Sequence, residues 1–155
     1  MLGGGQTESL EYNSLRPGMR IVLDEMREDP YPVSVGTQGS VMGRDDAGEV
    51  QMSWDDGSGL KLLDIDSFHL VSGEGELAVS FENLKKNQEK GYNICPRCGK
   101  IFDVRRGAVS RRIRKINIAI CDLCGQNEAI EDFLKNNTMS VDDWYQVKLW
   151  QGRAE

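Results

Sequence analysis

Four cysteines form two pairs with the same internal spacing, Cys95-Pro-Arg-Cys98 and Cys121-Asp-Leu-Cys124, and a glycine follows each pair. Two thiolates at this spacing can turn toward one cation, and the glycine permits the backbone conformation of such a turn. The two pairs together are typical of a tetrahedral four-thiolate site. We therefore predict that these cysteines hold one structural metal ion, most simply Zn²⁺, with iron as the second choice.

The same thiols could instead form disulfides or take part in redox chemistry. The start of the chain, MLGGGQTESLEY, lacks the basic and apolar segments of a secretory signal, and no run of 18 apolar residues could cross a bilayer. We expect a cytoplasmic protein that does not contact membranes, and reduced thiols in that compartment favour metal binding. A site closed by four thiolates has no open position for water, so we predict a structural role for the ion.

Basic side chains are concentrated between the two cysteine pairs. From Arg97 to Lys115 there are eight of them against one acidic residue, Asp103. They could contact the phosphates of DNA or RNA, or they could offset the negative charge of a four-thiolate zinc site and of the acidic N-terminal half. We favour the first interpretation, because eight cations exceed what one site needs. The candidate binding residues are Arg105, Arg106, Arg111, Arg112, Arg114 and Lys115.

Charge divides the chain into two parts. Residues 1–90 carry 17 acidic and 8 basic side chains, whereas residues 91–155 carry 8 acidic and 11 basic ones. The acidic residues of the first part could capture a basic partner protein, but solvated turns explain most of them, since aspartate is common in turns. We therefore expect two modules of different character.

The first module reads as five short β-strands, MRIVLDEM, QGSVMGR, EVQMSW, LKLLDI and FHLV. Turn residues 45–48 and 55–59 predict tight hairpins on either side of the third strand. Val50, Met52 and Trp54 alternate with polar residues, so Trp54 is expected in the core. Five short strands in about 55 residues favour a small closed barrel of the SH3-like type.

The rest of the chain is expected to contain short helices. Residues 73–92 begin as a Gly/Ser/Glu linker and continue as a short helix with an apolar stripe. A second helix near residues 127–135 would place Ile130, Phe133 and Leu134 on one face. The predicted fold is mainly β with short helices, organised as a barrel module (1–72), a linker (73–92), and a zinc ribbon with a C-terminal helical tail (93–155).

Large aromatic side chains are concentrated in the tail, at Trp144, Tyr145 and Trp150. Their apolar area is unfavourable in water. We expect them to pack on the ribbon, with partner binding as the second interpretation.

Residues 17–71 also resemble a small bacterial and bacteriophage domain family of unknown function. The resemblance rests on Gly-x-Arg-x-x-Leu, Met-x-x-Asp-Pro, Gly-Thr-x-Gly-x-Val, Trp-Asp-x-Gly-Ser and Asp-x-Phe. It implies a small barrel that mobile elements often carry, and no established chemistry.

Residues 93–148 resemble small zinc-ribbon proteins of bacterial mobile elements and phages, through CPRCGK, AVSRR, ICDLCG, EAIEDF and SVDDWYQVK. This likeness implies zinc held by the four cysteines in a bacterial, possibly phage-encoded, protein. The Arg-Ile-Arg-Lys insertion and the longer tail depart from the pattern.

Three functions are compatible with these features. The first is a non-enzymatic interaction protein that engages nucleic acid or a nucleoprotein through the basic loop. The second is an inhibitor that occupies the surface of a host antiviral defence complex. The third is an enzyme that uses carboxylates of the barrel loops; it is disfavoured, because His69 is the sole histidine and no catalytic constellation is recognisable.

Overall fold

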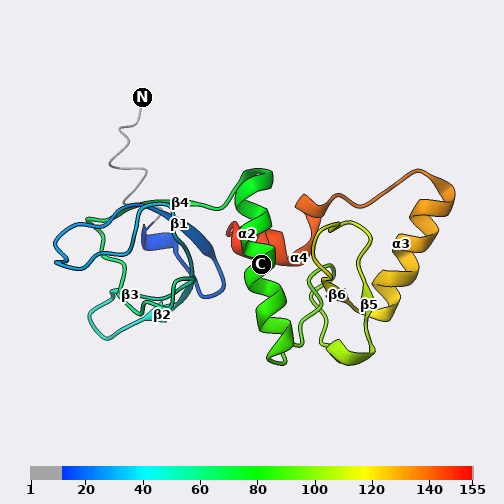
Figure 1. The fold of residues 1–155 in the computed structure, drawn as a ribbon, viewed down its shortest axis with the longest axis horizontal. Coiled ribbons are helices and arrows are strands. Elements are labelled where there is room, and N and C mark those ends of the chain that lie inside the picture. The colour runs from blue at the N-terminus through cyan, green and yellow to red at the C-terminus, as the bar shows by residue number, and fades with distance from the viewer. Residues whose placement is uncertain (1–11, 155) are drawn as a thin grey trace. The chain divides into compact units, whose positions relative to one another are not determined.

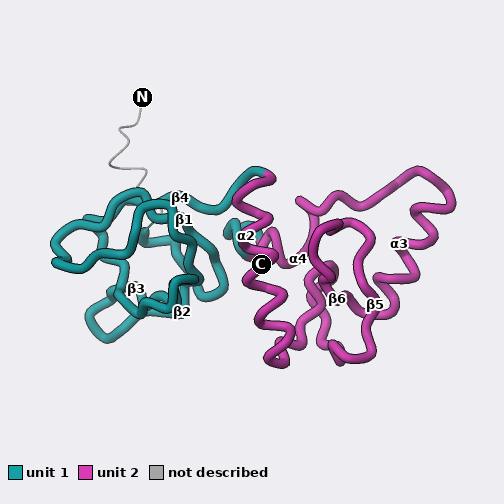
Figure 2. Tube along the Cα trace, in the orientation of Figure 1, with its two compact units in different colours: residues 1–73, 150–153 teal, residues 74–149, 154–155 magenta. Residues whose placement is uncertain are grey.

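The computed structural model describes residues 12–154, which fall into two compact units (Figure 2). The first unit comprises residues 12–73 together with Trp150–Arg153. The second comprises Glu74–Leu149 and Ala154. Each unit has its own secondary structure and its own buried side chains.

An antiparallel sheet of four strands forms the first unit, in the order β3-β2-β1-β4 (Figure 1). Its strands are β1 (Arg20–Glu25), β2 (Gln38–Arg44), β3 (Val50–Trp54) and β4 (Ser67–Leu70). The hairpin predicted at residues 45–48 is confirmed: the Gly48 N–H donates to the Asp45 carbonyl, and the Asp45 carboxylate accepts the N–H groups of Ala47 and Glu49. An aspartate therefore supplies the acceptors that this turn requires.

The prediction of a five-stranded closed barrel is wrong, because the sheet has four strands and does not close. The expected strand LKLLDI contributes only one bridge, between Leu62 and Val50. The Asp66 carboxylate accepts the N–H groups of Leu63 and Arg27, and the Asp66 N–H donates to the Leu63 carbonyl. These local bonds satisfy the backbone as a turn, so the segment cannot pair as a strand along its length.

Trp54 lies in the core of the first unit, as its alternation in β3 predicted. Its side chain is 2% exposed, and its indole N–H donates to the Leu60 carbonyl at 2.8 Å. Gly39 on β2 leaves room for this ring, since a Cβ there would lie 2.6 Å from it. Tyr12 is buried as well, and its hydroxyl donates to the Leu62 carbonyl at 2.8 Å. A β-branched or aromatic residue at position 39 could not be accommodated without moving Trp54.

The second unit combines helices with a two-stranded sheet, so the chain is mixed α/β and the expectation of a mainly β fold is wrong. Its elements are α2 (Gly73–Glu89), η1 (Val104–Arg106), β5 (Ala108–Val109), β6 (Ala119–Ile120), α3 (Asp122–Leu134), η2 (Val141–Asp143) and α4 (Tyr145–Trp150). The sequence predicted a linker with a short helix for residues 73–92, whereas α2 is 17 residues long.

Helix α2 buries the apolar stripe of Leu77, Phe81 and Leu84. Near its C-terminal end, the Gln88 side-chain amide donates to the Ala119 carbonyl and accepts the Ala119 N–H, at 2.8 and 3.0 Å. This amide satisfies the backbone of Ala119 on β6, the strand that leads into the second cysteine pair. Within residues 12–154, none of the helices has the length and apolar composition needed to span a bilayer.

Candidate metal centre

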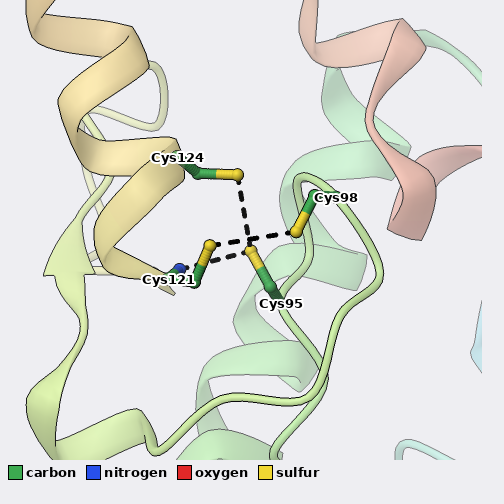
Figure 3. A group of neighbouring side chains, drawn as sticks. All are labelled: Cys95, Cys98, Cys121 and Cys124. Atoms are coloured by element: carbon green, nitrogen blue, oxygen red, sulfur yellow. Dashed lines mark hydrogen bonds between the residues drawn. The ribbon is translucent and has the colours of Figure 1, made fainter.

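The four predicted ligand residues come together in the second unit (Figure 3). Cys95 and Cys98 lie in a loop, and Cys121 and Cys124 lie at the start of helix α3. All four sulfurs are within 4.8 Å of one another. The structure therefore forms one four-cysteine cluster suited to a metal ion from two segments that are 22 residues apart.

The first cysteine pair is held by a tight turn. The Cys95 N–H donates to the Lys100 carbonyl at 2.7 Å, and the Gly99 N–H donates to the Cys95 carbonyl at 2.8 Å. Gly99 has a φ of +84°, a conformation that glycine adopts without strain. The proposed role of this glycine is therefore confirmed.

The second pair is positioned by a helix. Cys121 is the N-cap of α3 and Cys124 lies in its first turn, so both thiols face the same side of the helix start. The glycine that follows, Gly125, has an ordinary helical φ, and a Cβ there would lie 2.5 Å from the Ala108 side chain. Its role is close packing of α3 on β5, not the backbone freedom that the sequence suggested.

The distances between sulfurs fit a shared ion. Cys95 Sγ lies 3.9 Å from Cys124 Sγ, and Cys98 Sγ lies 3.8 Å from Cys121 Sγ. A disulfide would require about 2.0 Å. Around an ion that binds thiolates at about 2.3 Å, tetrahedral sulfurs stand about 3.8 Å apart. The arrangement is that of metal ligands, and all four cysteines are free.

The surroundings shift the pKa values of the thiols in different directions. Burial raises the pKa of Cys124 and of Cys95, and the charge of Cys95 raises that of Cys124 further. Burial also acts to raise the pKa of Cys121, but hydrogen bonds from the Cys124 backbone and from neighbouring thiols outweigh it and lower that pKa. Two buried thiols therefore resist ionisation in the absence of a cation, so metal binding must release protons.

Arg97 links the two cysteine pairs through side chains. Its side chain is 4% exposed, and its Nη2 lies 2.5 Å from Glu131 Oε2 on α3. Its Nη1 donates to the Cys124 carbonyl at 3.4 Å, and its Nε lies 3.6 Å from Glu128 Oε2. The sequence pattern did not predict a role for Arg97 in joining the two pairs. Two sequence features could have predicted its ion pairs: Arg97 lies inside the first cysteine pair, and carboxylates follow the second cysteine pair at helical spacing.

The basic loop also contacts helix α3. Arg112, whose side chain is 15% exposed, donates to Glu131 and to Asp132, each at 2.9 Å. The Arg111 N–H donates to Glu128 at 2.8 Å, and the Ser110 hydroxyl donates to the same carboxylate at 2.9 Å. Part of the loop therefore offsets carboxylates of α3, which neither of our interpretations of the basic residues had anticipated.

The remaining cations face solvent. Arg105 and Arg106 are 92% and 89% exposed, with only long contacts of 3.6 and 3.9 Å to Asp103. Arg114 and Lys115 are exposed and form no ion pair within residues 12–154. The structure thus separates the six candidate binding residues into four exposed cations and two that contact α3.

The aromatic tail packs inside the protein. Trp144 is fully buried and meets Phe81 edge to face, with 5.8 Å between ring centroids. Tyr145 lies against Gly99, and its N–H donates to the Arg97 carbonyl at 3.2 Å. Trp150 is 4% exposed. Trp144 and Trp150 are therefore buried, and Tyr145 packs on the predicted ribbon, whereas the ring of Trp144 contacts Phe81 of α2, outside the predicted ribbon.

His69 lies at the surface of the first unit. Its Nδ1 is 3.0 Å from Asp24 Oδ1, and both side chains are nearly half exposed. The prediction of a surface histidine is confirmed.

Residues 9–71 match the family described as a domain of unknown function (DUF4314). No curated protein and no solved structure shows significant similarity to the chain. The match covers the region where sequence analysis found its first resemblance and begins eight residues earlier. The first unit therefore contains a region similar to that family, and the four-cysteine cluster lies later in the chain, outside the matched residues.

Proposed function

We propose that the four cysteines hold one structural Zn²⁺ ion, and that the second unit binds nucleic acid or a nucleoprotein through its exposed cations. Zinc is the preferred ion because four thiolates at tetrahedral spacing match its usual structural site. A site with four protein ligands keeps no position for a reacting water, which supports a non-enzymatic role. Origin in a phage or mobile element rests on the sequence resemblance.

The observation that carries the binding proposal is the exposure of Arg105, Arg106, Arg114 and Lys115. An arginine that stabilises the fold is paired and shielded, as Arg97 and Arg112 are. The four exposed cations have no such role, and their charge is available for phosphate.

The exposed cations form two pairs that are separated along the hairpin. Arg105 and Arg106 lie in η1, just before β5, whereas Arg114 and Lys115 lie in the connection between β5 and β6. Because β5 and β6 are antiparallel, the two pairs flank opposite ends of this short hairpin. Phosphate contacts at two separate positions, with about two contacts at each, are the expected mode, with no requirement for base recognition.

Fluorescence anisotropy with labelled duplex DNA, single-stranded DNA and RNA over a range of salt concentrations tests the proposal. The slope of log affinity against log salt should fall by about 0.9 for each duplex contact removed, or about 0.7 on single strands. Two double variants each remove one pair of cations: Arg105→Glu/Arg106→Glu and Arg114→Glu/Lys115→Glu. Each should lower this slope by the amount expected for about two contacts. Lys86→Glu/Lys90→Glu, which reverses two exposed cations near the end of α2, is the matched control.

All variants should retain the metal, since none of the six residues is a ligand. Arg112 is left unchanged because its reversal would disrupt its ion pairs with α3. Wild-type binding that does not respond to salt, or reversal of all four cations without loss of affinity, would contradict the proposal.

A further inference from the structure

The four cysteines of the cluster differ in their access to solvent. Cys98 is exposed and Cys121 is half-buried, whereas Cys95 and Cys124 are buried. Oxidants reach a thiolate through solvent, so accessibility decides which of several thiolates reacts first. The cluster therefore has one accessible thiol pair and one shielded pair.

The two accessible cysteines are also neighbours across the cluster (Figure 3). Cys98 Sγ lies 3.8 Å from Cys121 Sγ, and the two residues belong to different cysteine pairs. The shielded sulfurs of Cys95 and Cys124 are 3.9 Å apart, and Cys95 Sγ accepts the Cys121 N–H at 3.2 Å. A hydrogen bond to a thiolate draws on its charge and lowers its nucleophilicity. Burial and this hydrogen bond both protect Cys95.

We propose that Cys98 is an oxidation site for hydrogen peroxide, that it then closes a reversible disulfide with Cys121, and that the metal ion is released. The proposal rests on the structural Zn²⁺ ion proposed above. It adds a modification site to the second unit and a condition, the presence of peroxide, under which that unit loses its ion.

The chemistry has two steps. The Cys98 thiolate attacks one peroxide oxygen, so that an S–O bond forms, the O–O bond breaks, and hydroxide leaves a sulfenic acid behind. The Cys121 thiolate then attacks the Cys98 sulfur, so that the S–S bond forms, the S–O bond breaks, and a second hydroxide leaves. The two thiolates together give up two electrons, and one peroxide is reduced to two hydroxides.

Disulfide formation removes two of the four ligands. A structural zinc site needs four, so the two remaining thiolates, Cys95 and Cys124, do not close a tetrahedron around the ion. Because metal binding contributes folding free energy to such modules, the oxidised second unit should be less stable than the metal-loaded one.

Contacts that involve no sulfur hold the two segments together while the disulfide closes. Arg97 pairs with Glu131 on α3, and its Nη1 donates to the Cys124 carbonyl at 3.4 Å. Cys121 is the N-cap of α3 and has an extended backbone, so it lies just outside the regular helix. The Cys98 and Cys121 sulfurs must approach from 3.8 Å to about 2.0 Å. A small shift at the helix start is therefore enough.

Peroxide titration of the metal-loaded full chain, with a coloured zinc chelator as the readout, tests the proposal. Cys98→His replaces the exposed thiol with another zinc ligand, and it should slow zinc release at least about tenfold because imidazole forms no sulfenic acid. Met42→Leu is the matched control, since it removes a sulfur-containing side chain that is 59% exposed in the first unit. It should release zinc at the wild-type rate.

Disulfide mapping of the oxidised wild-type chain identifies the bond without any substitution. After alkylation of the free thiols, trypsin cleaves after Arg97 and separates Cys95 from Cys98. A protease that cleaves before aspartate separates Cys121 from Cys124 at Asp122. Mass spectrometry should then find the fragments of Cys98 and Cys121 joined. Reduction with a dithiol in the presence of zinc should restore the metal content.

Three results would overturn the proposal while leaving the zinc site intact. These are a metal-loaded chain from which peroxide releases no zinc, a first disulfide between any other two cysteines, and oxidation of Cys98 to higher acids without a disulfide. If Cys98→His fails to hold zinc, the mapping of the wild-type chain decides. A reduced wild-type chain that binds no zinc before peroxide is added would overturn both proposals, so the starting metal content distinguishes the two failures.

Discussion

Arg97 and Glu131 form a part-buried ion pair between the first cysteine pair and helix α3, with 2.5 Å between Nη2 and Oε2. Arg97 lies between Cys95 and Cys98, and Glu131 lies about two turns after Cys124. The two segments that supply the thiols are therefore joined by a second link that does not involve a metal. The four-cysteine cluster and this ion pair involve the same helix.

Replacement of Arg97 tests the energetic weight of this link. Arg97→Ala leaves the Glu131 carboxylate largely buried beside only one remaining arginine, and we expect it to lower the free energy of unfolding by about 3–5 kcal/mol. Arg105→Ala removes an arginine that is 92% exposed and should change stability by less than about 0.5 kcal/mol. Chemical denaturation of the metal-loaded protein compares them, and equal effects would show that the part-buried pair does not stabilise the unit.

Acid should lower the stability of the first unit, because it protonates the Asp45 carboxylate. The hydrogen bond from Lys61, with further bonds from the backbone of Glu49 and Ala47, holds the pKa of Asp45 below its ordinary value. Because the folded pKa is lowered, the stabilisation is present above the unfolded pKa and is lost as pH falls through the folded pKa.

Asp45→Asn should therefore remove part of the acid dependence of unfolding below about pH 4, the ordinary aspartate range. Urea unfolding followed through the amide signal of Val50 measures this in the first unit, away from the thiols. Asp46→Asn makes the same change of charge at the next residue and serves as the control. If both variants keep the wild-type pH profile, the Asp45–Lys61 pair does not contribute.

Gly99 should be intolerant of any side chain. Its φ is +84°, and a Cβ would lie 2.8 Å from the Tyr145 ring. Gly91 has a φ of +103°, but a Cβ there would meet no atom within 4 Å. We expect Gly91→Ala to destabilise by about 1–2 kcal/mol from the backbone alone. Gly99→Ala should lower the free energy of unfolding by about 1–3 kcal/mol more than Gly91→Ala does, because the added Cβ overpacks against Tyr145. Thermal unfolding provides the comparison, and equal losses would mean that Tyr145 does not pack there.

Trp54 should be essential to the first unit. Trp54→Ala removes a ring that is 2% exposed, and we expect a loss of about 3–5 kcal/mol with the metal content unchanged. Tyr31→Ala removes an aromatic ring that is 86% exposed and should have little effect. Urea denaturation together with metal analysis distinguishes these outcomes; a Trp54 variant of normal stability would show that the ring is not a core residue.

Features that depend on local chemistry could be predicted from the sequence. The cysteine spacing identified all four members of the cluster, because two residues between thiols and a following turn define the geometry within a few bonds. The alternation of Val50, Met52 and Trp54 placed Trp54 in the core, and Asp45 to Gly48 identified a hairpin.

Features that depend on contacts between distant parts of the chain could not be predicted from the sequence. The segment LKLLDI has the composition of a strand, but its Leu63 N–H donates to the Asp66 carboxylate, and the same carboxylate accepts the N–H of the distant Arg27. Helix α3 has an amphipathic pattern that predicts a buried apolar face. The requirement that Cys124 face the other thiols instead sets its rotation and leaves Phe133 exposed. The roles of Arg97 and Arg112 depend on carboxylates that the fold brings close.

The central claim, that the four cysteines hold one zinc ion that folds the second unit, is tested most directly by native mass spectrometry of the wild-type chain and of Cys121→Ser. We predict one zinc per wild-type chain. We also predict that the variant loses the ion and the second unit unfolds, while the first unit keeps its structure, because metal binding supplies much of the folding free energy of such modules. A second unit that is folded without metal, in either protein, would contradict the account.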